Sequence, residues 1–250
     1  MRWFVLFLFV ALPAWGESVV LGLSQDEIAI TTSFDGSEIL VFGAVKREVP
    51  VPDGPELEVI ITVAGPSVPV MVRRKEKRLG IWVNTDAVEV DQAPSFYAVA
   101  TSGLLRDVLR DTEDLRYQIS VPRAIRSVGA PMSITDAPSF TEALIRIRSD
   151  ARLYQLQENQ VAVDEQTLFR ARIELPAALT EGAYATRIFL TRDGQVVSNY
   201  ETSIDVRKVG LERWLFSLSR EQPGIYGLMS LAIASFAGWG ASAAFSLLRN

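Results

Sequence analysis

Three carboxylates that could act as a general acid and base lie close together, at Asp86, Glu89 and Asp91. A pair of carboxylates can hydrolyse a glycosidic bond, with one donating a proton and the other attacking or activating water. Side chains alternate between the two faces of a strand, so Glu89 and Asp91 would share one face. Acids at that spacing are typical of the solvated side of a sheet. A carboxylate-based hydrolase is therefore the less favoured hypothesis, and we expect no enzymatic activity.

A group of arginines, Arg146, Arg148 and Arg152 beside Asp150, could bind an anion. Guanidinium groups hold carboxylates and phosphates through paired, charge-assisted hydrogen bonds. The pattern equally fits the solvated face of a helix, and we favour that interpretation. Arginines that converge on a cleft would instead indicate a ligand-binding or envelope-binding module, which is the main alternative function.

A basic hairpin is predicted over residues 70–84, where cations lie between two apolar arms. The cations are Arg73, Arg74, Lys75, Lys77 and Arg78. Such a cluster can contact anionic lipid head groups or an acidic partner. It can also be a solvated tip whose charges prevent strand-to-strand aggregation, and the sequence favours this second interpretation. Trp82 has strand spacing between Ile81 and Val83, which predicts a position in the core.

The composition excludes several kinds of chemistry. The chain has 0 cysteines and 0 histidines, which excludes Ser-His-Asp triads, cysteine nucleophiles and zinc sites built from those residues. A Ser-Lys dyad and an all-oxygen metal site stay open, but no motif favours either, so we predict no cofactor and no metal site. The formal net charge of −5 argues against nucleic acid, whose binding proteins present basic surfaces.

All these groups precede a predicted membrane anchor at the C-terminal end of the chain. Residues 225–248 contain no Asp, Glu, Lys or Arg. A helix of roughly 20 apolar residues can cross a bilayer. Small side chains recur along it at every fourth position, and they are Ser230, Ala234, Gly238, Ser242 and Ser246. Helices in membranes pair through small residues that allow close backbone approach. The sequence therefore predicts a docking face for a second transmembrane helix.

The residues before this span predict an amphipathic helix at the membrane interface. Residues 209–222 carry an apolar face made of Leu211, Trp214, Leu215 and Leu218, and Tyr226 follows after Pro223 and Gly224. Tryptophan and tyrosine are enriched where a protein crosses the membrane surface. The alternative is an ordinary helix that packs on the exported domain.

The N-terminus predicts export. Arg2 precedes a short apolar run and the small residues Ala14 and Gly16, which is the pattern of a secretory signal peptide over residues 1–16. A single span then leaves the N-terminal part outside and the C-terminus in the cytoplasm. We therefore expect a single-pass protein of the bacterial inner membrane with a periplasmic domain.

Between these ends the pattern is mainly β. Short Val- and Ile-rich runs separated by turn residues predict immunoglobulin-like antiparallel β-sandwich units with a short helical insert. We expect an N-terminal domain over 17–92, a helical or mixed region over 93–152, a second β unit over 153–208 and the transmembrane helix with its tail over 223–250. In the helical region we expect one helix over 103–110 and a second that begins with Ser139 as its N-cap and Glu142 in a capping box.

Several runs resemble an alphaproteobacterial family of putative transmembrane proteins. They are L-F-R-A-R-I-E-L-P (168–176), G-A-Y-A-T-R-I-F-L-T-R-D-G (182–194), K-V-G-L-E-R-W-L (208–215), Y-G (226–227), G-W-G (238–240), R-R-K-E-K-R-L-G-I-W-V-N (73–84) and F-T-E-A-L-I-R (140–146). The resemblance implies an exported β-rich domain with one C-terminal span, and it implies no catalytic residues. It also implies a link to a sulfite-exporter-like permease, often encoded beside members of the family.

We therefore expect a non-enzymatic, membrane-anchored accessory or interaction protein. A single span cannot form a pore by itself, so a transport role requires a partner. The expected partners are the lipid bilayer and either an integral membrane protein, such as a transporter, or further copies of the chain.

Overall fold

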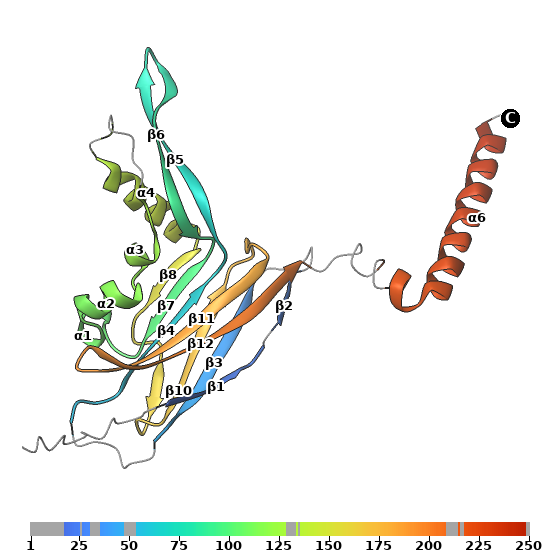
Figure 1. Cartoon of the computed structure of the whole chain (residues 1–250). Helices are drawn as coiled ribbons and strands as arrows, with labels where there is room; N and C mark the ends of the chain where they lie inside the picture. The colour runs from blue at the N-terminus through green and yellow to red at the C-terminus, as the bar shows by residue number, and fades with distance from the viewer. Residues whose placement is uncertain are drawn as a thin grey trace, which may run out of the picture. The chain divides into compact units, whose positions relative to one another are not determined.

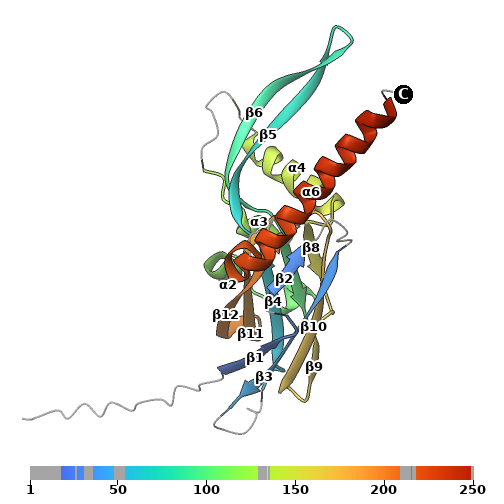
Figure 2. The ribbon, with the colours of Figure 1, turned by 90° about the vertical axis from the view of Figure 1, so that its right-hand side faces the viewer.

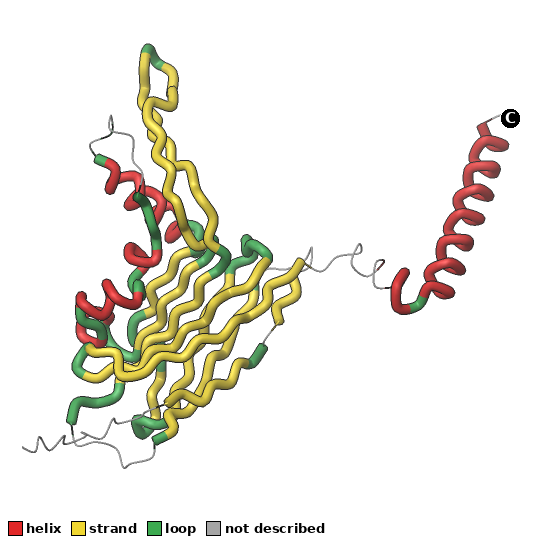
Figure 3. Tube along the Cα trace, viewed as in Figure 1, coloured by secondary structure: helices red, strands yellow, loops and turns green. Residues whose placement is uncertain are grey.

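A computed structural model describes residues 18–25, 27–30, 36–47, 54–128, 134, 136–208, 215 and 218–248, with backbone alone for residues 208 and 242–248. Within these ranges the protein is mainly β, with one long apolar helix near the C-terminus (Figures 1 and 3). This confirms the predicted fold class. The predicted signal peptide lies outside the described residues. Among the described residues, 18–27 and 36–206 belong to one compact unit, and 28–30 with the C-terminal helix belong to another.

The first sheet is four-stranded and antiparallel, in the order β1-β3-β10-β9. Its strands are β1 (Ser18–Leu23), β3 (Ser37–Lys46), β10 (Leu168–Leu175) and β9 (Ala162–Asp164). Burial alternates strictly along β10, where Phe169 and Ile173 are buried and Leu168 is exposed. That period of two is the pattern of a sheet with one face turned to the core.

The second sheet is six-stranded, in the order β2-β12-β11-β4-β7-β8. Its strands are β2 (Glu27–Ile30), β12 (Gln195–Lys208), β11 (Gly182–Arg192), β4 (Glu58–Ala64), β7 (Tyr97–Thr101) and β8 (Tyr154–Gln157). The central strands β4 and β7 are buried on both faces, because the other sheet covers one side and helices cover the other (Figures 1 and 2). This explains why their sequences are continuously apolar rather than alternating.

The two β units predicted from the sequence share their sheets. Strand β3 pairs with β10, and β4 pairs with β11, although each pair joins residues from opposite ends of the domain. The immunoglobulin-like detail is not confirmed, since β7 and β8 pair in parallel whereas an immunoglobulin sandwich is antiparallel. Local patterns predict strands but not their partners, because pairing depends on packing between distant segments.

In the described residues of the connection between β7 and β8 there are four helices. They are α1 (Leu105–Val108), α2 (Asp111–Tyr117), α3 (Val121–Ala124) and α4 (Ala137–Asp150). The single helix predicted over 103–110 is shorter than expected, because Leu109 is extended at its end. The predicted N-cap of α4 is wrong, since Asp136 occupies that position and Ser139 lies inside the first turn. Pro138, whose fixed φ suits a first helical turn, accounts for the earlier start.

A long hairpin, β5 (Ser67–Arg78) and β6 (Ile81–Pro94), projects beyond the sheets (Figures 1 and 2). Its base is anchored, because Val88 and Val90 are fully buried and α4 packs beside it. Its distal part has no second layer to cover it. Trp82 is 68% exposed, so its predicted core position is wrong.

The second unit contains the helix α6 (Pro223–Leu248). By length and composition, residues Pro223–Ala241 could cross a membrane, and none of this window is buried. The span predicted over 225–248 is confirmed as one helix. The break before it lies at Gln222 rather than at Pro223-Gly224, because Pro223 takes the first helical position.

Candidate functional site

The predicted docking face lies along α6. Among the small residues of this face, Ser230, Ala234 and Gly238 are exposed on the helix, and their four-residue spacing aligns them along one side. The hydroxyl of Ser230 donates to the carbonyl oxygen of Tyr226 at 2.9 Å. This bond satisfies the hydroxyl within the helix, so it imposes no polar cost on a lipid-facing surface. The side chains of Ser242 and Ser246 lie outside the described residues.

The predicted interfacial residues are only partly described. Leu211 and Trp214 lie outside the described residues, and Leu215 and Leu218 are half-buried. Tyr226 is exposed in the first turn of α6. The amphipathic helix at the membrane surface therefore stays a prediction.

The five cations of the predicted basic cluster have two different environments in the structure. Arg74 occupies the first. Its guanidinium donates to Asp136 Oδ2 at 2.5 Å and to Ser139 Oγ at 2.9 Å, and it lies 3.7 Å from Asp86 Oδ2. It also covers the ring of Phe140, 4.5 Å from the centroid. The hydrogen bond from Arg74 lowers the pKa of Asp136, and the pKa of Arg74 rises in turn. Arg74 is therefore a structural clamp between the hairpin and α4.

The remaining four cations occupy the second environment, near the tip of the hairpin, and all four are exposed. Arg78 pairs with Glu76 at 3.3 Å. Within the described part of the chain, Arg73, Lys75 and Lys77 make no ion pair closer than 4.0 Å.

Beside these cations lie exposed apolar residues that the sequence analysis did not select, namely Leu79, Ile81 and Trp82. A signal for them was present. The turn between β5 and β6 falls at Leu79 and Gly80, and the basic run that precedes it marks a solvent-exposed end of the hairpin.

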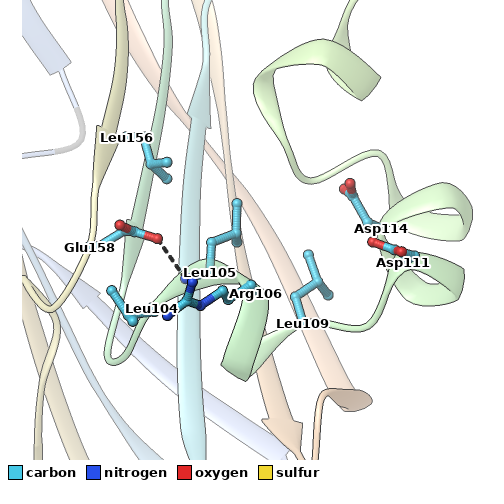
Figure 4. A pocket seen from close by; sticks show the side chains of 8 residues that line it. All are labelled: Leu104, Leu105, Arg106, Leu109, Asp111, Asp114, Leu156 and Glu158. Carbon is cyan, nitrogen blue, oxygen red and sulfur yellow. Dashed lines mark hydrogen bonds between the residues drawn. The ribbon is translucent and has the colours of Figure 1, made fainter.

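A pocket of about 420 Å³ lies between α1, α2 and β8 (Figure 4). Its lining combines leucines with charged groups, and it consists of Leu104, Leu105, Arg106, Leu109, Asp111, Asp114, Leu156 and Glu158. Two of its carboxylates already have structural partners. Glu158 Oε1 accepts from the Leu105 amide at 2.8 Å, and Asp114 accepts from the amides of Ile119 and Ser120. The pocket is a weak candidate for catalysis, because these carboxylates serve the backbone.

The predicted carboxylate group separates in the structure. Glu89 and Asp91 are exposed while Val88 and Val90 are buried, as the alternation predicts. Asp86 faces Arg74, and Asp91 accepts from the Val128 amide at 2.6 Å. Among the described residues, no group of three or more His, Cys, Asp or Glu could hold a metal ion.

The predicted anion site does not assemble. Arg146 and Arg152 are exposed. Arg148 instead turns inward, where it donates to the Pro94 carbonyl and, at 2.8 Å, to the hydroxyl of Tyr154. The three arginines therefore do not converge on a cleft. The solvated helix face favoured by the sequence describes Arg146, whereas Arg152 lies in the turn after the end of α4.

A buried polar network at β7 was not predicted. The hydroxyl of Tyr97 donates to the carbonyl oxygen of Ile119 at 2.8 Å and accepts from Arg187 at 3.2 Å. Arg187 also donates to the carbonyl oxygen of Tyr117 at 2.9 Å. Burial raises the pKa of Tyr97, which keeps the hydroxyl protonated as a donor. This network connects the sheet to the helical segment.

The sequence was compared with known families and proteins. The model of one family, described as "Putative transmembrane protein (Alph_Pro_TM)", matches residues 18–246. The search of curated proteins gave no match.

Proposed function

The chain belongs to this family of transmembrane proteins, and from that premise we propose that it is a non-enzymatic accessory protein of the bacterial inner membrane. In this proposal α6 anchors the chain and docks against an integral membrane protein, such as a transporter, or against a second copy. The β-rich unit lies in the periplasm, exported by the signal peptide predicted over residues 1–16.

The observation that carries the proposal is the surface of α6. A helix that serves only as an anchor needs apolar length, and any mixture of apolar residues supplies it. Here Ser230, Ala234 and Gly238 recur at every fourth position along one side, with Leu231 at its edge, while Phe236 and Trp239 lie on the opposite side. Close approach of a second helix needs such a side, because dispersion contacts rather than burial from water drive helix pairing in lipid.

The hydrogen bonds and ion pairs of the carboxylates in the β-rich unit also support an interaction role. Of the carboxylates that sequence and structure bring forward, Asp86, Asp91, Asp114 and Glu158 have partners that stabilise the fold, while Glu89 is exposed on β6 and Asp111 lines the pocket. General acid or base catalysis needs a side chain that can reach a proton of the substrate. Carboxylates that already bind the backbone or Arg74 do not meet this condition.

The proposal can be tested by affinity purification of the full chain in mild detergent, followed by mass spectrometry. The native chain is compared with a variant carrying Ala234→Leu and Gly238→Leu, which fills the docking face. The matched control carries Ala232→Leu and Gly240→Leu, which adds the same side-chain atoms on the opposite side of the helix.

We expect an integral membrane protein, or a second tagged copy, to co-purify with the native chain and the control but not with the docking-face variant. Equal recovery with both variants would show that the face is not used. If neither a partner nor a second copy is recovered with the native chain, the accessory role is wrong.

A further inference from the structure

The distal end of the β5/β6 hairpin exposes large apolar side chains to solvent. Leu79 is 105% exposed, Ile81 64% and Trp82 68%. They occupy three of the four positions 79–82 around the turn, on the part of the hairpin that projects beyond the sheets (Figure 2). Single exposed apolar residues are common, but several exposed apolar side chains in one place indicate a binding surface for a protein, a ligand or a membrane.

The backbone of the turn strengthens this argument. Leu79 has φ of 50° and Gly80 has φ of 88°, so both central residues of the two-residue turn are left-handed. That geometry favours Asn or Asp followed by Gly, and a bulky leucine is disfavoured there. Leucine at position 79 is unfavourable for two reasons. The left-handed backbone conformation disfavours a bulky residue, and the apolar side chain is exposed to water. Residues that break local rules in this way are expected at functional sites.

Cations surround the apolar tip. Strand pairing places Lys77 opposite Trp82 and Arg78 opposite Ile81, so each apolar residue has a basic neighbour on its own face. Lys75 and Arg73 continue this basic surface toward the base of the hairpin. Residues 73–84 contain five cations against one carboxylate, Glu76, in a chain whose net charge is −5.

We propose that this hairpin tip binds the surface of an anionic lipid bilayer, with Leu79, Ile81 and Trp82 among the head groups and the cations on the phosphates. Tryptophan and leucine flanked by lysine and arginine form the composition that partitions into a membrane interface. Polybasic segments are attracted to the negative surface of anionic membranes.

The lysines favour lipid over an acidic protein as the occupant. Lysine is depleted in protein–protein interfaces, where aromatic residues and arginine dominate. The chain has four lysines, at positions 46, 75, 77 and 208, and two of these lie at the tip.

The base of the hairpin is built to hold the tip in a fixed position. The Arg74 clamp joins β5 to α4 through Asp136 and Ser139, and Val88 and Val90 are buried beneath it. A fixed finger loses less conformational entropy on binding than a flexible loop would. This proposal concerns a second membrane contact, and it does not depend on the docking face of α6.

The experiment uses the full chain in nanodiscs, with a polarity-sensitive fluorophore attached at Leu79→Cys. Because the native chain has 0 cysteines, the label occupies a single position. The nanodiscs are mixed with vesicles of phosphatidylcholine alone or of phosphatidylcholine and phosphatidylglycerol in equal amounts. A lipid-bound quencher is placed first in the vesicles and then in the nanodisc, so that either membrane is detected. The matched control is a label at Val68→Cys, which is 46% exposed at the base of the same hairpin.

We expect quenching and a blue shift of the tip label when either membrane contains phosphatidylglycerol, and neither change at the base. In flotation assays, Lys75→Gln and Lys77→Gln should each weaken vesicle binding about fivefold. No quenching in either arrangement, equal quenching at tip and base, or equal quenching without phosphatidylglycerol would overturn the proposal.

Discussion

At the scale of single residues, the hydroxyl of Tyr97 has the clearest structural role. It donates to a buried carbonyl oxygen, that of Ile119, and accepts from Arg187. Tyr97→Phe removes the donor and leaves that carbonyl unpaired, so the free energy of unfolding should fall by about 1–2 kcal/mol. Denaturant titration of the full chain in detergent, followed by circular dichroism, measures the change.

The control for this prediction is Tyr200→Phe, because Tyr200 is 40% exposed on β12. Its loss should stay within about 0.5 kcal/mol, as for other surface changes. An equal, small loss in both variants would mean that the Tyr97 network contributes nothing to stability.

Leu79 gives a second prediction, in which stability and binding change in opposite directions. Leu79→Asn puts a residue that tolerates φ of 50° into the turn, so the hairpin tip should become more stable. Amide hydrogen exchange at Arg78 and Ile81 should slow, while binding to anionic vesicles weakens. Faster exchange in the variant would show that the native leucine does not strain the turn.

Residue types exclude several kinds of chemistry, but they do not predict the exposed tip of the hairpin. The absence of cysteine and histidine removed whole classes of site, and the alternation of Val88, Glu89, Val90 and Asp91 was read correctly. Trp82 was placed in the core because tryptophan is usually buried and its neighbours had strand spacing. Strand spacing does not show whether another sheet or a helix covers a strand. Here the hairpin extends beyond the two larger sheets.

At the scale of elements, the contact between the hairpin and α4 should depend on pH. The Arg74 hydrogen bond lowers the pKa of Asp136 below its ordinary value of 3.8. The stabilisation is therefore complete above that value and is lost as the pH falls through the lower pKa of the folded state. Resonances of the Phe140 ring, 4.5 Å from the guanidinium, should shift over this acidic range.

In Asp136→Asn the Phe140 resonances should be displaced already at neutral pH and should not titrate. The ring of Phe96, which packs on Tyr184, serves as the internal reference and should not move in either protein. An unchanged Phe140 titration in the variant would assign the pH dependence to another carboxylate, such as Asp86.

Helices could be predicted where the residues of the helix itself carried the signal. The apolar run near the C-terminus predicts α6, and Ser139 with Glu142 predicts α4, although the N-cap of α4 is Asp136. Helices α2 and α3 are not predicted, because their boundaries, such as the extended Leu109 and Arg110 between α1 and α2, depend on tertiary contacts. The Arg110 amide, for example, donates to the Gly194 carbonyl in the turn after β11.

At the scale of the whole molecule, the sheets combine strands that lie more than a hundred residues apart. Removing the residues after 152 would take away β10 and β11, the partners of β3 and β4. We expect such a fragment to lack cooperative unfolding, because two edges of apolar strands would be left unpaired. Thermal unfolding followed by circular dichroism measures this, with the chain ending at residue 208 as control. A cooperative transition in the shorter fragment would show that residues 17–152 fold by themselves.

The central claim concerns the docking face of α6, and crosslinking in the membrane tests it most directly. Leu231, which lies on the same side as Gly238 two turns earlier, and Ile233 are replaced one at a time, in the full chain in intact cells, by a photoreactive phenylalanine derivative. Both native residues are large, so the label leaves the small residues of the docking face in place. The two positions point to opposite sides of the helix, about 200° apart. We predict that the label at Leu231 captures an integral membrane protein or a second copy of the chain, and that the label at Ile233 captures neither. Capture at both positions alike, or no protein captured from Leu231, would contradict the account.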